Sequence, residues 1–203
     1  MSTLLSNGRQ FIVYHQKQIL NECVKANFVD CRINAYPVQT DSGLLQAPNI
    51  IFIDIDLNPF NKDYREDMEK LNKTLNKILR NIEFRLDGFK PTVLWTGNGY
   101  HICIMMDTRP LELIVELNQI SKNPSERFLR FSEMKLSANR NDPNHNPSFK
   151  SCMLRIPYSL NSKCMHIQDP EVKIVQRFDP NIIPKLDAAL LREYRIYLAD
   201  LDL

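Results

Sequence analysis

The most strand-like segment of this 203-residue chain is Ile50-Ile51-Phe52-Ile53-Asp54-Ile55-Asp56-Leu57. Because side chains alternate between the two faces of a β-strand, its odd-numbered residues share one apolar face, which we expect in the core. The other face starts with Ile50 and Phe52 and ends with Asp54 and Asp56. A strand that is apolar on both faces at its start and carries two carboxylates at its end predicts a buried strand that opens onto a cleft.

The two acids of this strand suit metal chemistry. Residues two apart on a strand lie about 6.5 to 7 Å apart at their α-carbons, so Asp54 and Asp56 repel each other unless a positive charge sits between them. Hard divalent cations such as Mg²⁺ and Mn²⁺ prefer oxygen ligands and often bind together with phosphates. The alternatives are a pair of acids that face water, or the paired acids of a glycoside hydrolase, for which the sequence supplies no aromatic sugar platform.

Hydrophobic periodicity and turn residues predict both helices and further strands before and after this strand in the sequence. The expected helices are 8–20, 63–82, 111–122, 125–138 and 184–201. The other expected strands are 31–38, 92–95, 100–106, 152–156 and 172–176. Thr96–Gly99 predicts a hairpin between two of these strands, because Asn-Gly tolerates the positive φ of a tight turn. This irregular alternation favours an α+β fold with mixed sheets and packed helices around a cleft.

Composition indicates an ordinary soluble domain. Hydrophobic residues make up 43% and charged residues 25% of the chain, with a net charge of +2, which predicts no overall attraction to nucleic acid or to a membrane. The five cysteines are scattered without Cys-x-x-Cys pairs, as expected for reduced thiols in the cytoplasm. No apolar run reaches the ~18 residues that cross a bilayer. We therefore expect a cytoplasmic protein that has no membrane partner.

The charges are segregated along the chain. Residues 54–70 carry six acids, whereas residues 139–163 carry four basic residues and one acid, Asp142, for a local balance of +3. The basic stretch suits phosphate backbones, although a solvated loop is the simpler alternative. Gly97 and Gly99 of the hairpin permit close approach of backbone amides to phosphate oxygens, with His101 just beyond them. In isolation, a turn followed by a half-buried histidine with a backbone partner is the better explanation of that pattern.

Three segments in this order resemble the motif series of the archaeo-eukaryotic primase superfamily, most closely the primase-polymerases of archaea and of their plasmids or viruses. The segments are Phe-Ile-Asp-Ile-Asp (52–56), Trp-Thr-Gly-Asn-Gly-Tyr-His-Ile (95–102) and Arg-Ile-Pro-Tyr-Ser-Leu-Asn-Ser-Lys (155–163). The likeness spans about residues 30–178. It implies a primase catalytic core related to the RNA-recognition-motif fold, with an N-terminal αβ unit, over residues 1–180. Residues 181–203 would then form a C-terminal helix that packs on the core.

The resemblance also implies roles for individual residues. Asp54 and Asp56 match the ligands of Mg²⁺ or Mn²⁺. The residues matching the motif for the incoming triphosphate are Thr96, Gly97, Gly99 and His101. The residues matching the basic motif near nucleotide and template are Arg155, Ser159, Asn161 and Lys163, with Tyr158 where the family usually has glycine. A third catalytic carboxylate is expected on a strand between these two motifs; Asp142 is the first choice and Asp107 the alternative.

The function implied is template-directed nucleotidyl transfer with two divalent ions, as in a DNA primase or polymerase. Its partners would be a single-stranded DNA template, NTP or dNTP, and other primase subunits or a fused or associated helicase. The alternative is a noncatalytic accessory subunit or nucleic-acid-binding module of the same fold. A nuclease or phosphodiesterase that uses the same acids is a third possibility, which the histidine after the glycine turn favours less.

Overall fold

The fold is described from a computed structural model, which covers residues 2–36, 48–57, 64–108, 111, 117, 119, 123–150, 152–165 and 169–201, with the backbone alone for 64–66. The described strands form two four-stranded sheets. The first sheet has the order β2 (Arg9–Val13), β1 (Ser2–Ser6), β3 (Arg32–Asn34) and β7 (Met153–Arg155). The second has the order β4 (Ile50–Asp56), β6 (Gly99–Met105), β5 (Thr92–Trp95) and β8 (Lys173–Gln176).

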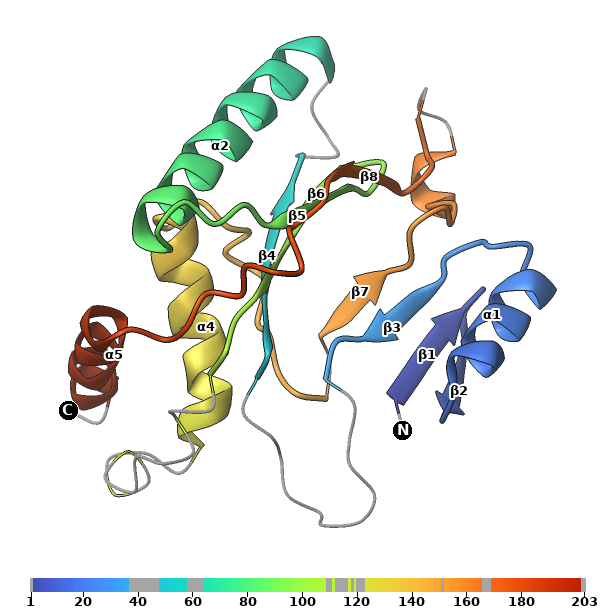
Figure 1. The fold of residues 1–203 in the computed structure, drawn as a ribbon. Helices are drawn as coiled ribbons and strands as arrows, with labels where there is room; N and C mark the ends of the chain where they lie inside the picture. The colour runs from blue at the N-terminus through green and yellow to red at the C-terminus, as the bar shows by residue number, and fades with distance from the viewer. Residues whose placement is uncertain are drawn as a thin grey trace.

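The helices lie on the outer sides of the sheets. They are α1 (Gln16–Lys25), α2 (Tyr64–Arg85), α4 (Pro124–Ser137) and α5 (Ala188–Leu201). In Figure 1 the second sheet lies between α2, α4 and α5 on one side and the first sheet on the other. Helices α2 and α4 contact β4, α5 contacts α4, and α1 contacts β1 and β2. The expected α+β class is confirmed, although every strand pair within the two sheets is antiparallel rather than mixed.

The larger hydrophobic core lies between the second sheet and its helices. The odd-numbered face of β4 enters this core as predicted, with Ile51 and Ile53 fully buried. From the other side, α5 contributes Tyr194, whose ring packs against Phe128 and Phe131 of α4. On the inner face of β4, Phe52 is buried in the same cluster, and the end of that face, with Asp54 and Asp56, is left for the cleft.

The N-terminal prediction of a helix over residues 8–20 is wrong. Residues Arg9–Val13 form β2, which pairs with β1 in a hairpin, and α1 begins only at Gln16. Asn7 and Gly8 both adopt positive φ, 44° and 74°, as the Asn-Gly turn of a tight hairpin requires. The turn signal was present in the sequence, and the helical spacing of the apolar residues after it obscured it.

The other predictions hold with shifted ends or lie outside the described residues. The predicted strands at 92–95, 100–106, 152–156 and 172–176 are observed as β5, β6, β7 and β8. The predicted strand 31–38 is observed over Arg32–Asn34, and its last residues are not described. The predicted helix 111–122 falls almost wholly outside the described residues. The C-terminal helix starts at Ala188, after Asp187, whose Oδ1 accepts a hydrogen bond from the Leu190 amide at 2.7 Å.

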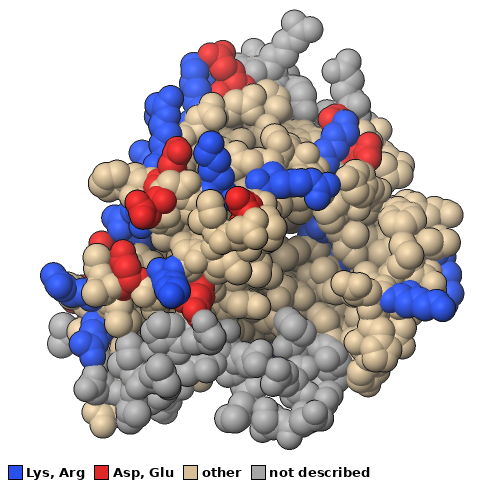
Figure 2. Space-filling model, viewed as in Figure 1, with Lys and Arg blue, Asp and Glu red and all other residues tan. Residues whose placement is uncertain are grey.

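Charged side chains of both signs are interspersed over the face seen in Figure 2, and no large patch of one sign stands out among the residues drawn in colour. This distribution agrees with the small net charge of +2. Among the described residues, no helix has the length and apolar character that crossing a membrane would need.

Candidate functional site

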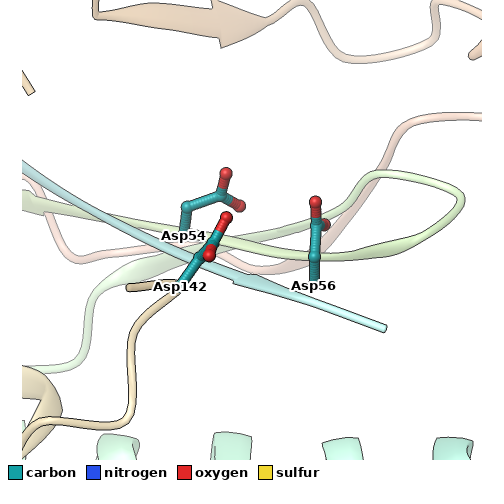
Figure 3. Close-up of side chains that lie close together, drawn as sticks. All are labelled: Asp54, Asp56 and Asp142. Atoms are coloured by element: carbon teal, nitrogen blue, oxygen red, sulfur yellow. The ribbon is translucent and has the colours of Figure 1, made fainter. Parts of the chain in front are cut away.

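Three carboxylates converge at one point on the inner face of β4. Asp54 and Asp56 belong to β4, Asp142 belongs to the loop after α4, and one oxygen atom from each lies within 4.8 Å of the others. Figure 3 shows the three side chains projecting to the same side of the strand. Asp142 therefore takes the position expected of the third acid. The alternative, Asp107, lies elsewhere, in a β-bridge with Lys185.

Backbone hydrogen bonds at the sheet edge bring Asp142 to this point. Strand β4 is an edge strand, so the backbone groups of Asp54 can reach partners outside the sheet. Its carbonyl accepts a hydrogen bond from the Asp142 amide at 2.8 Å, and its amide donates to Glu133 Oε1 at 3.4 Å. Asp142 thus lies in a loop docked on the edge of β4, and the expectation that the third acid would lie on a strand is wrong.

A buried pair that the sequence analysis did not identify supports this arrangement. Glu133 of α4 is fully buried, and its Oε1 lies 2.7 Å from Nδ1 of His145, in the same loop as Asp142. Burial raises the pKa of Glu133. Burial opposes protonation of His145, but the hydrogen bond and the charge of Glu133 raise the pKa of the imidazole overall. Glu133 therefore joins the amide of Asp54 to the loop that carries Asp142.

Removing the Glu133 carboxylate is expected to destabilise the protein. In Glu133→Ala, the amide of Asp54 and the ring of His145 lose a buried acceptor, which lowers the free energy of unfolding by about 2 kcal/mol. Urea unfolding followed by circular dichroism measures the change. The matched control is Glu83→Ala, an exposed residue of α2, which is expected to change stability by less than about 0.5 kcal/mol. Equal stability of the two variants would contradict this role of Glu133.

No lysine or arginine forms an ion pair with the three acids among the residues that the structure describes. Burial raises the pKa of Asp54 to about 7, and the charge of Asp56 acts in the same direction. The pKa of Asp56 is also raised, by burial and then by Asp142. Asp54 Oδ1 is buried without a hydrogen-bond partner. A buried, unpartnered oxygen beside two further carboxylates is a donor set that fits a hard divalent cation, so the cluster could bind a metal ion.

The glycine hairpin shapes the second sheet beside these acids. Its turn is closed by a hydrogen bond from the Thr96 amide to the Gly99 carbonyl at 3.0 Å, and Gly97 adopts a φ of +88°. The positive φ predicted for Asn-Gly therefore falls one position earlier, on Gly97. Gly99 is the first residue of β6 and pairs with Asp56. A Cβ atom there would collide with the Ile55 carbonyl and lie 2.6 Å from Asp56 Oδ1.

Replacement of Gly99 is therefore expected to disturb the site more than replacement of a glycine in open space. Gly99→Ala forces β6 away from Asp56 and is expected to lower unfolding stability by about 2 kcal/mol or more. The control is Gly88→Ala, because Gly88 has a φ of +82° but no atom within 4 Å of the place that a methyl group would take; it is expected to lose about 1 kcal/mol from backbone strain alone. Thermal unfolding of both variants tests the difference, and an equal loss would contradict it.

His101 of β6 lies directly beside Asp54. The two residues are register partners, and His101 Nε2 lies 3.6 Å from Asp54 Oδ1. Burial, followed by the charges of Arg155 and Arg32, lowers the pKa of His101 to about 3. The ring is therefore neutral at pH 7, with one donor and one acceptor nitrogen. Its ring forms a T-shaped contact with the ring of Phe52, which makes a second such contact with His145.

A cleft of about 1360 Å³ separates the acids from a basic wall. Asp54 and Asp56 belong to the second sheet and Asp142 to the loop docked on it, whereas Arg32 of β3 and Arg155 of β7 belong to the first sheet. Other basic residues that line the cleft are Lys70, Arg140 and Lys163. Arg155 is buried, and its Nη1 lies 3.4 Å from Asp30 Oδ1. The cleft therefore has walls of opposite charge.

The remaining predicted residues divide between the cleft and the framework. Thr96 and Asn161 line the cleft, and Asn161 Nδ2 donates to the Thr96 carbonyl at 2.8 Å. Ser159 is fully buried and donates its hydroxyl to the Ile156 carbonyl at 2.6 Å, so it is not brought into the cleft. Gly97 and Gly99 shape the hairpin without lining the cleft. Tyr158 adopts a φ of 68°, the left-handed conformation that glycine adopts without strain.

Comparison with known proteins adds no relative from which a role could be transferred. No protein-family model matches the chain, and no curated protein matches it.

Proposed function

We propose that this chain is a template-directed nucleotidyltransferase, a DNA primase or polymerase that acts on a single-stranded DNA template with NTP or dNTP. The observation that carries the proposal is the pairing of two walls. Three carboxylates converge within 4.8 Å on one wall, and Arg32 and Arg155 of the first sheet lie on the other. A reaction that joins a nucleotide triphosphate to a strand needs both signs, one for divalent cations and one for phosphates.

The residues of each wall have distinct tasks in this proposal. Asp54, Asp56 and Asp142 would hold Mg²⁺ or Mn²⁺, which supplies charge neutralisation at the phosphates and lowers the pKa of an attacking hydroxyl. Arg155 and Lys163 bind phosphate oxygens, Arg155 through its planar fork and Lys163 as an exposed point charge. His101, a neutral ring beside Asp54, donates one hydrogen bond within the cleft. Catalysis then rests on positioning and electrostatic stabilisation.

The size of the cleft supports a substrate larger than a free nucleotide. Sites for small molecules usually enclose about 300 to 1,000 Å³, and this cleft encloses about 1360 Å³. The volume suits a nucleotide together with the end of a nucleic-acid strand. Other primase subunits or a helicase are proposed partners, because the net charge of +2 gives little long-range attraction to DNA.

A template-dependent incorporation assay tests the proposal. Labelled NTPs and labelled dNTPs are supplied separately with Mg²⁺ or Mn²⁺, on single-stranded DNA with and without an annealed primer. The expected result is product that depends on both template and divalent cation. Template binding without incorporation under any of these conditions would favour a noncatalytic accessory subunit of the same fold, and cation-dependent shortening of the template would favour a nuclease.

A further inference from the structure

Two arginines stand side by side on the basic wall of the cleft. Arg32 of β3 and Arg155 of β7 are register partners in an antiparallel pair, and both line the cleft. Directly opposed residues of such a pair hold their side chains next to each other, with β-carbons about 4.5 to 5.5 Å apart. Like charges in this position destabilise a sheet, so a nearby negative charge is needed to offset the repulsion between the two arginines.

The described residues compensate only one of the two charges. Asp30 pairs with Arg155 at 3.4 Å and also accepts a hydrogen bond from the Ser162 amide at 3.1 Å. Arg32 forms no ion pair with a described residue, and its Nε is buried without a hydrogen-bond partner. Two guanidinium groups and one carboxylate leave a net charge of +1 at this wall. A buried guanidinium donor without an acceptor is costly, which indicates that a ligand supplies the acceptor.

We propose that Arg32 and Arg155 together form a binding site for a phosphate group, with Arg32 as a phosphate ligand that none of the sequence motifs includes. Two adjacent guanidinium forks offer several N–H donors to one tetrahedral anion, a geometry that suits phosphate better than chloride or a single carboxylate. The phosphate comes from the triphosphate of a nucleotide in the cleft, and this choice of source rests on the function proposed above.

The acidic wall favours an extended anion. Arg32 and Arg155 line the same cleft as Asp54, Asp56 and Asp142. The arginine pair and the acid cluster are therefore close enough for one ligand to face both. A polyphosphate chain meets this condition, because one end can reach the guanidinium groups while the other end carries divalent cations toward the carboxylates.

Titration with inorganic tripolyphosphate in the presence of a chelator tests the site without any catalytic step. Isothermal calorimetry compares wild type with Arg32→Gln, which is expected to bind tripolyphosphate at least about tenfold more weakly, because a charge-assisted bidentate contact is lost. The matched control is Arg9→Gln, which makes the same charge change at an exposed position of β2 in the same sheet and is expected to bind as wild type does. Unchanged binding by folded Arg32→Gln would overturn the proposal.

Thermal unfolding separates lost binding from lost folding. Without anion, Arg32→Gln is expected to melt at or above the wild-type temperature, since the repulsion between the two arginines is relieved. If this variant does not fold, Arg32→Lys keeps the charge but loses the fork, and it is expected to bind tripolyphosphate less tightly than wild type. Equal affinity of folded Arg32→Lys and wild type would count against a site built on the arginine fork.

A second titration identifies the source of the phosphate. A single-stranded oligonucleotide replaces tripolyphosphate in the same comparison. Weakened binding of tripolyphosphate alone supports the nucleotide tail, whereas weakened binding of the oligonucleotide alone overturns that source and leaves a site for the strand backbone. Arg32-dependent binding of tripolyphosphate by a protein that incorporates no nucleotide would refute the proposed function and leave the anion site standing.

Discussion

Simultaneous replacement of Asp54 and Asp56 by alanine is expected to abolish template-directed incorporation, with a loss of at least about a thousandfold. Both residues contribute an oxygen to the acid cluster. Asp142 alone binds a divalent cation too weakly, because one carboxylate does not replace enough of the water molecules around the ion. Binding of single-stranded DNA is expected to remain measurable, because the substitutions remove none of the basic residues that line the cleft. Primer-extension gels and fluorescence anisotropy measure the two activities on the same preparation.

Controls for this loss come from acids outside the cluster. The control variant combines Glu83→Ala with Asp200→Ala, which also removes two negative charges but from exposed positions on α2 and α5. It is expected to leave incorporation near the wild-type level. Single variants then identify the third acid: Asp142→Asn is expected to lose at least about a hundredfold, and Asp107→Asn is expected to remain active. Synthesis retained by the Asp54/Asp56 double variant would refute the assignment of the site.

Local periodicity was sufficient to predict β4 and its acids. The two-residue repeat places Ile51 and Ile53 in the core and leaves Asp54 on the opposite face, and no distant contact is needed for that inference. The hairpin was also predictable, because glycines between two apolar strand segments usually form a tight turn. Which glycine takes the positive φ was not predictable, since Gly97 and Gly99 differ only in their tertiary surroundings.

The rest of the site depends on contacts between distant parts of the chain. Asp142 reaches β4 through a backbone hydrogen bond to Asp54, which no residue type encodes. Arg32 lies beside Arg155 only because β3 and β7 are neighbours in the first sheet. In the sequence, β4, β5 and β6 of the second sheet lie between these two strands. Its basic character alone gave no signal, since most arginines lie in solvent.

Two residues show what side-chain chemistry adds to the pattern. Glu133 had a signal in the sequence, because it falls on the same helical stripe as Leu129 and Leu136 of α4, where a charge is unusual. Ser159 belongs to one of the sequence motifs, but its hydroxyl donates a hydrogen bond to the neighbouring Ile156 carbonyl. The resemblance predicts Ser159 near the nucleotide, whereas the structure shows its side chain buried and bonded to the backbone.

Asp54→Asn is expected to make the metal-free protein more stable at alkaline pH while removing its stabilisation by Mg²⁺ or Mn²⁺. Burial raises the pKa of Asp54 from 3.8 to about 7 in the folded state. Between these two values the folded protein holds a proton that the unfolded chain releases, so stability falls as pH rises from about 4 to about 7 and then levels off. The loss is on the order of 4 kcal/mol, and an asparagine at this position does not incur it.

Urea unfolding at about pH 5 and about pH 8 tests the sign of this effect. With a chelator present, the stability advantage of Asp54→Asn over wild type is expected to be larger at the higher pH. When Mg²⁺ or Mn²⁺ is added at the higher pH, wild type is expected to gain stability and Asp54→Asn to gain much less, because cation binding to the folded state alone stabilises that state. Glu83→Gln on α2, which is exposed, is expected to follow wild type throughout. An advantage of Asp54→Asn that is equal at both pH values would mean that the Asp54 carboxylate is not the destabilising group, since only a titrating acid makes the difference depend on pH.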